Sequence, residues 1–454
     1  MDKFIDECGV VAVTLKNNYE AATSAFFGLT SLQHRGQQSA GLAVCHEGVL
    51  SCYKEMGLVT EVLDEKILTL LKGEMALGHV KYGPEVESFK TAAQPIVINY
   101  RNGSIATAFS GALVNGKELR TKMEEDGVIF STNTDCEVIA ALIARHDKGN
   151  VPIAIKVAMQ EIKGGYAFCV MTNDTMIGAR DPFGLRPLAL GKLDGGYVLA
   201  SESCAFDTME GEFIRDINPG EIVVIEKDRI LSIDAGAAPK SALCTFEYVY
   251  FSRADSTLDG LNVYKVREIA GEILAKEHPA QADIVIGIPD SGTPAAIGFS
   301  IASGVPYKPG MIKNKYIGRI FIQSTQTQRE VGVRIKLNPI DSIVKGKSVV
   351  LVDDSIVRGT TMRKIVALIR EAGAKEVHLR ISSPPVRSSC YFGVDTPDIN
   401  DFIANDHTID EIREELGADS LGFLSIEGLL ESLGGTDFCT GCFSGIYPID
   451  PTQA

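Results

Sequence analysis

The sequence predicts a protein of two domains, an α+β first half followed by an α/β second half. Short β-rich runs separated by turn residues fill the first half, whereas near-continuous apolar strands alternate with helical patterns in the second. The stretch 233–242, rich in small residues and bearing Gly and Pro, is the predicted linker. A length of 454 residues leaves room for two or three domains of roughly 150 residues each.

The first half is predicted to form paired antiparallel sheets with helices outside. Its β-rich runs extend from Cys8–Leu15 to Glu221–Asp228, and turn signals such as NGS, PFG and LDGG separate them. Helical periodicity is limited to Ala22–Leu32 and Asp135–Arg145. This mixture is typical of a layered α+β domain, which we expect to span residues 8–235.

The second half is predicted to contain a parallel sheet covered on both faces. ADIVIGIPD, SVVLVDD and EVHLRISSPP are apolar strands, and the helical patterns are Val263–Glu277, Thr293–Ala302 and Thr361–Glu371. We expect this domain, with a C-terminal segment, to span residues 244–454. Ligands of such sheets bind at the carboxyl ends of the strands, so the residues there are candidates for chemistry.

Charge and composition limit the classes of partner. The 59 acidic and 44 basic side chains give a net charge of −15, which argues against binding to nucleic acid or to an anionic membrane. No apolar stretch approaches the about eighteen residues that span a bilayer. The acidic N-terminus lacks the basic region of a signal peptide, so we expect a cytoplasmic protein. Ten cysteines are too few for a disulfide scaffold.

An acidic pair and a hydroxyl-rich turn follow the second apolar strand. Asp353 and Asp354 end the strand, and 355–361 leads into a helix. Successive N–H groups at a helix N-terminus bind phosphate, and Gly359 permits close approach of the backbone. Paired carboxylates beside a phosphate suit ribose hydroxyls and Mg²⁺. For a generic Asp-Asp-Ser string, a solvated turn is the alternative.

The whole string VVLVDDSIVRGTT resembles the ribose-phosphate signature of type I phosphoribosyltransferases, which displace pyrophosphate from phosphoribosyl pyrophosphate (PRPP). The resemblance implies that Asp353 and Asp354 hold the ribose and Mg²⁺, and that Ser291 in PDSG lies near the metal. KNKYIGR resembles the lid that closes over PRPP. The residues implied to bind PRPP are Asp353, Asp354, Ser355, Arg358, Gly359, Thr360, Thr361, Lys313 and Tyr316.

Cys8 is the candidate nucleophile of the first half. An N-terminal catalytic residue uses its own α-amine as the base, so this role requires removal of residues 1–7 as a propeptide. A buried strand residue is the alternative on residue type alone. CGVVAV, LQHRGQQSAGLAV, GHVKY and RDPFGLRPLALG, however, all resemble glutamine amidotransferases of the N-terminal-nucleophile class, whose fold has four αββα layers.

The order of the two halves resembles the family of glutamine PRPP amidotransferases, from Cys8 to about Tyr447. That resemblance implies synthesis of 5-phosphoribosylamine from PRPP and glutamine or ammonia, the first step of purine biosynthesis. It further implies a homotetramer and inhibition by purine nucleotides.

Two positions depart from the family pattern around glutamine. Lys81 stands where GHVRYST has Arg, and a point charge replaces a planar fork. Ser110 stands where HNGNLVN has the Asn that forms the oxyanion hole with the next residue, here Gly111. Loss of such a donor costs on the order of 10²–10³ in rate. Asp135 matches the carboxylate implied to hold the glutamine α-amine.

These departures leave two alternatives beside the glutamine-using enzyme. One is an ammonia-dependent paralogue with a disabled glutaminase. The other is a non-catalytic sensor of PRPP or nucleotides, which the intact acidic pair, phosphate loop and lid disfavour.

Four cysteines form the last candidate site. A lone C-x-x-C string is a weak signal that zinc or packing explains as well as a cluster. Four thiolates suit either a 4Fe–4S cluster or zinc, so the spacing leaves the metal open. The iron–sulfur branch of the resembled family carries its cluster on four matching positions, here Cys244, Cys390, Cys439 and Cys442.

Overall fold

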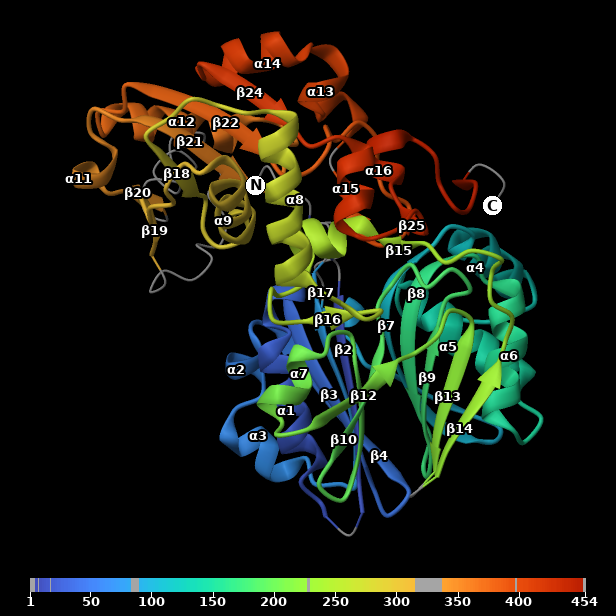
Figure 1. The fold of residues 1–454 in the computed structure, drawn as a ribbon. Helices are drawn as coiled ribbons and strands as arrows, with labels where there is room; N and C mark the ends of the chain where they lie inside the picture. The colour runs from blue at the N-terminus through green and yellow to red at the C-terminus, as the bar shows by residue number, and fades with distance from the viewer. Residues whose placement is uncertain are drawn as a thin grey trace.

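The computed structural model describes residues 5–6, 8–16, 18–82, 90–226, 229–314, 337–396 and 398–451. The two halves of the chain lie one above the other, with both sheets of the first half in the lower part of Figure 1 and the parallel sheet in the upper part. The fold class predicted from the sequence is confirmed.

The first half contains two antiparallel sheets. The seven-stranded sheet has the order β12-β10-β11-β2-β5-β3-β4, and the six-stranded sheet β14-β13-β9-β8-β7-β6. The strands of the former are β2 (Cys8–Leu15), β3 (Ser39–His46), β4 (Val49–Met56), β5 (Met75–Lys81), β10 (Ala189–Leu193), β11 (Gly196–Ala200) and β12 (Glu212–Asp216). Those of the latter are β6 (Ile96–Tyr100), β7 (Gly103–Leu113), β8 (Gly164–Met171), β9 (Met176–Arg180), β13 (Glu221–Glu226) and β14 (Arg229–Asp234).

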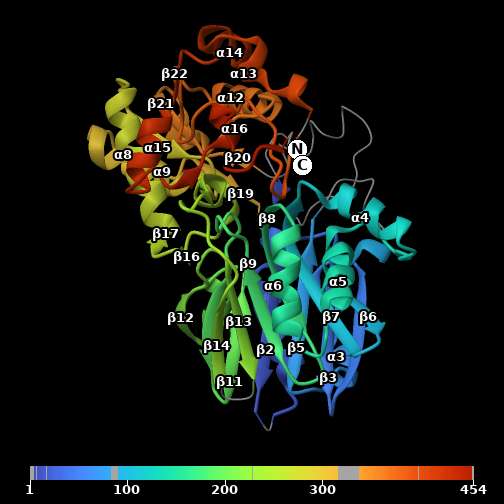
Figure 2. The ribbon, with the colours of Figure 1, turned by 90° about the vertical axis from the view of Figure 1, so that its right-hand side faces the viewer.

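Helices cover the outer faces of both sheets. Strand β2 shows why: Val11 and Val13 pack outward under α1 (Ala21–Ser31), while Val10 and Ala12 pack inward against the other sheet. The second sheet is covered by α5 (Asp135–His146) and α6 (Val151–Glu161) (Figure 2). The result is the αββα layering. The sequence predicted α1 and α5 but missed α6, and it missed α4 (Gly116–Glu125), which buries few apolar side chains.

The second half contains a four-stranded parallel sheet of order β18-β21-β22-β24. Val350 and Val352 of β21 pack against α8 and α9, while Val349 and Leu351 pack on the other face with α12 and α14. Burial on both faces therefore explains the continuous apolar strands. The elements are β18 (Ile284–Gly287), β21 (Ser348–Asp353), β22 (Glu376–Ile381), β24 (Ser420–Phe423), α8 (Val263–Glu277), α9 (Gly292–Ser303), α12 (Thr360–Glu371), α14 (Ile409–Leu416) and α15 (Ile426–Ser432).

Short elements complete the chain. The lid region is entered by β19 (Met311–Lys313), which pairs with β20 (Leu337–Pro339); the lid residue Tyr316 lies outside the described residues. The others are β1 (Ile5–Asp6), η1 (Gln33–Arg35), α2 (Val59–Val62), α3 (Glu65–Leu70), η3 (Lys90–Ala92), α7 (Cys204–Thr208), β16 (Thr257–Leu258), β17 (Leu261–Asn262), α11 (Asp341–Val344), β23 (Val394–Asp395), η5 (Ile399–Asp401), α13 (Ile403–Asp406) and α16 (Gly441–Ser444).

The chain crosses from one half to the other through a packed join. Strand β15 (Leu243–Cys244) pairs in parallel with β25 (Phe438–Cys439), and the π-helix η4 (Glu247–Phe251) follows. A bidentate ion pair between Arg180 and Asp259 fastens β9 to the β16–β17 turn, with distances of 2.7 and 2.8 Å. The join packs against both halves. The domain boundaries predicted from the sequence, residues 8–235 and 244–454, stay predictions.

Candidate active sites

The predicted phosphate loop lies at the carboxyl edge of the parallel sheet. Strand β21 ends at Asp353, and α12 begins at Thr360. Gly359 caps the helix with φ of 77°, a left-handed conformation that glycine adopts freely. The backbone N–H groups of the first turn of α12 are thus directed into the loop, as an anion site requires.

The acidic pair joins two loops of the sheet edge. Asp354 is fully buried and accepts hydrogen bonds from Ser291 Oγ and, at 2.5 Å, from Ser355 Oγ. A Cβ atom on Gly292 would lie 2.6 Å from the carbonyl oxygen of Val352, so only glycine permits this approach of the loops. The structure therefore brings together Ser291, Asp353 and Asp354, the residues predicted to hold Mg²⁺.

The two cationic side chains predicted for PRPP are paired with carboxylates at the rim. Lys313 Nζ lies 2.7 Å from Asp290 Oδ2, and Arg358 Nη2 lies 2.5 Å from Asp401 Oδ2. Both cations are about half-exposed, and exposed ion pairs contribute little stability. Each cation is thus available to exchange its carboxylate for an incoming phosphate.

Cys8 begins the central strand β2 and is buried. Its register partner on β5 is Lys81, which places both side chains on the same face of the sheet. The backbone carbonyl of Cys8 accepts hydrogen bonds from Ser110 Oγ and Arg35 Nε, both at 3.1 Å. The Ser110 hydroxyl, predicted at the oxyanion hole, therefore donates to the backbone of the nucleophile.

The other residues predicted for the glutamine site lie on β7 of the facing sheet and at the start of α5. Gly111 has φ of 129°, and a Cβ there would lie 2.1 Å from the carbonyl oxygen of Gly165. Asp135 Oδ2 accepts from the backbone N–H of Leu113 at 2.8 Å, which holds the start of α5 beside the end of β7. The structure thus brings Ser110 to the backbone of Cys8, whose register partner is Lys81, and brings Asp135 to the backbone of Leu113, two residues beyond Gly111.

His79 of β5 forms a hydrogen bond with the backbone of β7. His79 Nε2 lies 3.0 Å from the carbonyl oxygen of Phe109, one residue before Ser110. Burial lowers the pKa of His79 to about 3, so the ring is neutral near pH 7. A neutral ring that meets a carbonyl must carry its proton on Nε2, and it fixes β7 to β5.

Sequence reasoning missed Arg35, although it lies within the quoted string LQHRGQQSAGLAV. The side chain is fully buried, and its guanidinium contacts Glu202 and Glu247 as well as Cys8. The polar run around Arg35 gives no signal that its side chain is buried, and its partners Glu202 and Glu247 are far away in the sequence.

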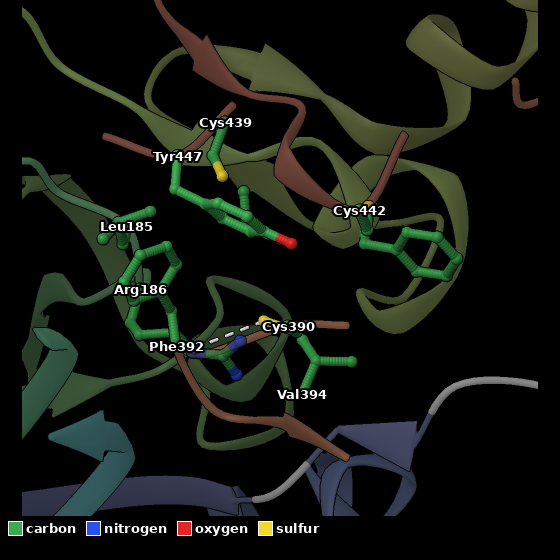
Figure 3. Close-up of a pocket in the computed structure, with 10 residues that line it drawn as sticks. Leu185, Arg186, Cys390, Phe392, Val394, Cys439, Cys442 and Tyr447 are labelled. Atoms are coloured by element: carbon green, nitrogen blue, oxygen red, sulfur yellow. Dashed lines mark hydrogen bonds between the residues drawn. The ribbon is translucent and has the colours of Figure 1, made fainter. Parts of the chain in front are cut away.

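The four cysteines line one cavity at the join of the two halves. Cys244 and Cys439 are register partners on β15 and β25, and the backbone carbonyl of Cys442 accepts from the N–H groups of Arg387 and Ser388 at 2.9 and 3.0 Å. Figure 3 shows Cys390, Cys439 and Cys442 around the cavity with the ring of Tyr447 among them. The lining is otherwise mainly apolar, with Leu185, Arg186, Phe246, Phe392 and Val394.

Burial suppresses ionisation of three of these thiols, those of Cys244, Cys439 and Cys442. It raises the pKa of Cys439 to about 12 and the pKa values of Cys244 and Cys442 further, and the thiols raise one another's pKa. Such thiols are inert as nucleophiles, and a metal that bound them would have to displace their protons. Among the described residues, no three His, Cys, Asp or Glu side chains converge closely enough to hold a single metal ion.

Fold and sites together define a glutamine amidotransferase domain joined to a phosphoribosyltransferase domain. The model of the glutamine amidotransferase domain family matches residues 85–208, and that of the phosphoribosyl transferase domain family matches residues 258–393. None of the helices in the described part of the chain is long and apolar enough to cross a membrane.

Relatives over the full length specify the family. The chain is 45% identical to an amidophosphoribosyltransferase of Bacillus subtilis, covering 99% of this chain and 95% of the relative. It is 44% identical to the Archaeoglobus fulgidus amidophosphoribosyltransferase, covering 97% and 98%. The solved glutamine PRPP amidotransferase from B. subtilis in complex with ADP and GMP superposes with a TM-score of 0.92 at 44% identity, covering 98% of both chains. The chain belongs to the amidophosphoribosyltransferase family.

Substitution of Asp354 by Asn is expected to weaken PRPP binding at least tenfold in the presence of Mg²⁺. The neutral amide retains the size of the carboxylate but removes the charge that Mg²⁺ and the ribose require. Titration calorimetry measures the affinity. Asp283→Asn is the matched control, because Asp283 accepts from the Ser348 N–H at 2.9 Å at the opposite end of β21. Equal affinities of the two variants would contradict the assignment.

Substitution of Lys81 by Arg is expected to lower the KM for glutamine about tenfold. A guanidinium supplies two parallel hydrogen bonds to a carboxylate where the ammonium supplies one point charge, a gain of about 1.5 kcal/mol. Steady-state glutamine hydrolysis measures KM, and ammonia-dependent turnover of PRPP is the control that should not change. An unaltered KM would show that Lys81 does not contact the substrate carboxylate.

Proposed function

We propose that the chain makes 5-phosphoribosylamine from PRPP and glutamine, the first step of purine biosynthesis. The observation that carries this function is the match to amidophosphoribosyltransferases at about 45% identity over nearly the whole of both chains. The sheet-edge loop 353–361 agrees with it chemically, because its acidic pair and helix N-terminus suit a phosphorylated sugar.

In the second half, the bond between C1 of the ribose and pyrophosphate breaks. Pyrophosphate leaves with the electron pair, ammonia forms the C1–N bond, and the ammonia nitrogen loses a proton. The first turn of α12 binds the 5-phosphate, and Lys313 and Arg358 exchange their carboxylate partners for phosphate oxygens. Ser291, Asp353 and Asp354 would hold Mg²⁺, which neutralises charge on the departing pyrophosphate.

In the first half, the Cys8 thiolate attacks the carboxamide of glutamine. The leaving nitrogen takes up the proton that the thiol gave to the α-amine and departs as ammonia, and water then hydrolyses the thioester to glutamate. Removal of Met1–Glu7 supplies the free α-amine that accepts the thiol proton, and an α-amine titrates at roughly 7.7–8.0, close to neutral pH. Lys81 and Asp135 bind the carboxylate and amine ends of glutamine. Ammonia must reach PRPP unprotonated, so the passage between the sites excludes water.

The two alternatives have no support in the comparisons. The full-length relatives described above are amidophosphoribosyltransferases, and their names support neither the ammonia-dependent paralogue nor the non-catalytic sensor.

Regulation and assembly follow the same reasoning. A relative's structure contains ADP and GMP, and a second structure, with a TM-score of 0.93 at 45% identity, is described as the allosteric regulatory enzyme of purine biosynthesis. We therefore propose that purine nucleotides inhibit this chain. From the resemblance to the family alone, we also propose that it assembles as a homotetramer, and from the acidic N-terminus that it acts in the cytoplasm.

We also propose a 4Fe–4S cluster on Cys244, Cys390, Cys439 and Cys442. Four thiols that face one mainly apolar cavity fit a cluster held by Cys ligands. The raised pKa values of Cys244, Cys439 and Cys442 favour protonated thiols until metal is bound. The cluster would fasten the C-terminal segment to the join, because the cysteines come from β15, β25 and the segments beside them.

Release of pyrophosphate from PRPP tests the proposed function directly. The purified chain with Mg²⁺ is expected to release pyrophosphate with glutamine and also with ammonium salts. The Cys8→Ala variant should retain the ammonium reaction alone. Turnover with ammonium only in the unaltered chain would contradict the glutaminase half of the proposal, and turnover with neither nitrogen source would contradict the whole.

Substitution of Cys442 by Ser is expected to lower the iron content and the visible absorbance of anaerobically purified protein. A hydroxyl is a poorer ligand for iron than a thiolate. Cys52→Ser is the control, since Cys52 is an exposed cysteine on β4. Zinc rather than iron in the unaltered protein, or equal iron in both variants, would contradict the cluster.

A further inference from the structure

A buried ion cluster lies directly beneath the glutaminase nucleophile and includes a carboxylate from the other half of the chain. Arg35 Nη2 lies 2.8 Å from Glu247 Oε1, and Arg35 Nη1 lies 3.0 Å from Glu247 Oε2, so the pair is bidentate. Nη1 also lies 2.6 Å from Glu202 Oε1. All three side chains are fully buried. Glu247 begins η4, the segment that opens the second half.

The same guanidinium holds the nucleophile. Arg35 Nε donates to the backbone carbonyl of Cys8 at 3.1 Å. Because the guanidinium is planar and rigid, the direction of Nε–H is fixed by the bidentate contact at the other end. The orientation of the Cys8 peptide therefore depends on where Glu247 lies.

Each charge in this cluster is stabilised by the opposite charges beside it. Burial by itself would raise the pKa of Glu247, but the positive charges of Arg35 and Arg186 hold it below its ordinary value. Ser252 Oγ donates to Glu247 Oε2 at 2.5 Å. A buried carboxylate with these partners stays ionised, and removal of its charge leaves the facing guanidinium under-compensated.

The segment that carries Glu247 is itself anchored. Arg267 of α8 is buried and donates from Nε to the backbone carbonyl of Tyr248 at 2.6 Å and from Nη2 to that of Ser252 at 2.8 Å. These bonds clamp both ends of η4 onto the phosphoribosyltransferase half. The backbone of the segment that carries Glu247 is thus held by the second half, whereas Arg35, Arg186 and Glu202 of the cluster come from the first half.

We propose that Glu247 is a positioning residue of the glutaminase reaction: through Arg35 it orients Cys8, so the second half of the chain completes the glutaminase site. The inference rests on the proposed function, because it concerns the hydrolysis of glutamine at Cys8. Glu247 touches no substrate; its effect is on the geometry of attack.

Substitution of Glu247 by Gln is the test. The isosteric amide directs N–H donors at the guanidinium, so Arg35 shifts toward Glu202 and releases or tilts the Cys8 carbonyl. The kcat for glutamine hydrolysis is expected to fall about ten- to a hundredfold, a range typical of small misplacements of a reacting group. KM for glutamine should change little, because Lys81 and Asp135 are unaltered. Ammonia-dependent synthesis from PRPP should stay at the level of the unaltered chain.

Asp259→Asn is the matched control. It also neutralises a carboxylate in a bidentate pair between the two halves, with Arg180, yet that pair makes no contact with Cys8. Glutamine hydrolysis should be retained in this variant. Intact mass should show the same processing before Cys8 in all chains. Glu247→Asp, which keeps the charge but shortens the reach, is expected to show an intermediate kcat.

Several outcomes would overturn the positioning role. They are full-rate hydrolysis in Glu247→Gln, an equal loss in Asp259→Asn, or a change confined to KM. If Glu247→Gln does not fold, full-rate hydrolysis in Glu247→Asp overturns it. Failure of the proposed function is distinguishable, since the unaltered chain would then release no ammonia from glutamine.

Discussion

The buried guanidinium of Arg35 is the interaction on which the arrangement of the two halves depends. A fully buried positive charge is tolerated only with carboxylates in contact, and one of these, Glu202, belongs to the first half whereas the other, Glu247, belongs to the second. Separation of the two halves would therefore expose these charges to solvent or leave Arg35 without one of its two carboxylate partners. The same guanidinium donates to the backbone carbonyl of Cys8. The ion pairs that join the two halves therefore also influence how the backbone of Cys8 is oriented.

Other features of the join follow from this closeness. The parallel pairing of β15 with β25 brings the C-terminal Cys439 beside Cys244 at the start of the second half, and the cavity of the four cysteines reaches Leu185 of the first half. Gly393 lies so near Gly111 that a Cβ on it would be 2.5 Å from the Gly111 Cα atom. The elements that form the predicted glutamine site, the cysteine cavity and the domain join are thus packed against one another. A substitution that shifts one of them is expected to shift the others.

The sequence was sufficient to predict elements whose residues are contiguous in the chain. Helices α8 and α12 were predicted to within a residue because their apolar periodicity is complete, and the loop 353–361 was predictable because strand, acidic pair, glycine and helix are contiguous. Helix α4 was missed because it buries few apolar side chains. The Arg35–Glu247 pair could not be predicted, since its members are 212 residues apart and no periodicity connects them. The contact of Ser110 also required the fold, because only the packing of the two sheets on each other places its hydroxyl on the Cys8 carbonyl.

That hydrogen bond changes the meaning of the departures from the family pattern. A serine in place of the oxyanion asparagine suggests a loss, yet the Ser110 hydroxyl and the Arg35 guanidinium bind the same carbonyl oxygen from two directions. A carbonyl held by two donors has less freedom to rotate than one held by a single donor, so the backbone that bears the Cys8 side chain is held more rigidly. Stabilisation of the transition state needs donors that are already in place before charge develops. At Ser110 the chain has thus placed a donor on the peptide that carries Cys8, and the next residue, Gly111, has a backbone conformation that only glycine allows.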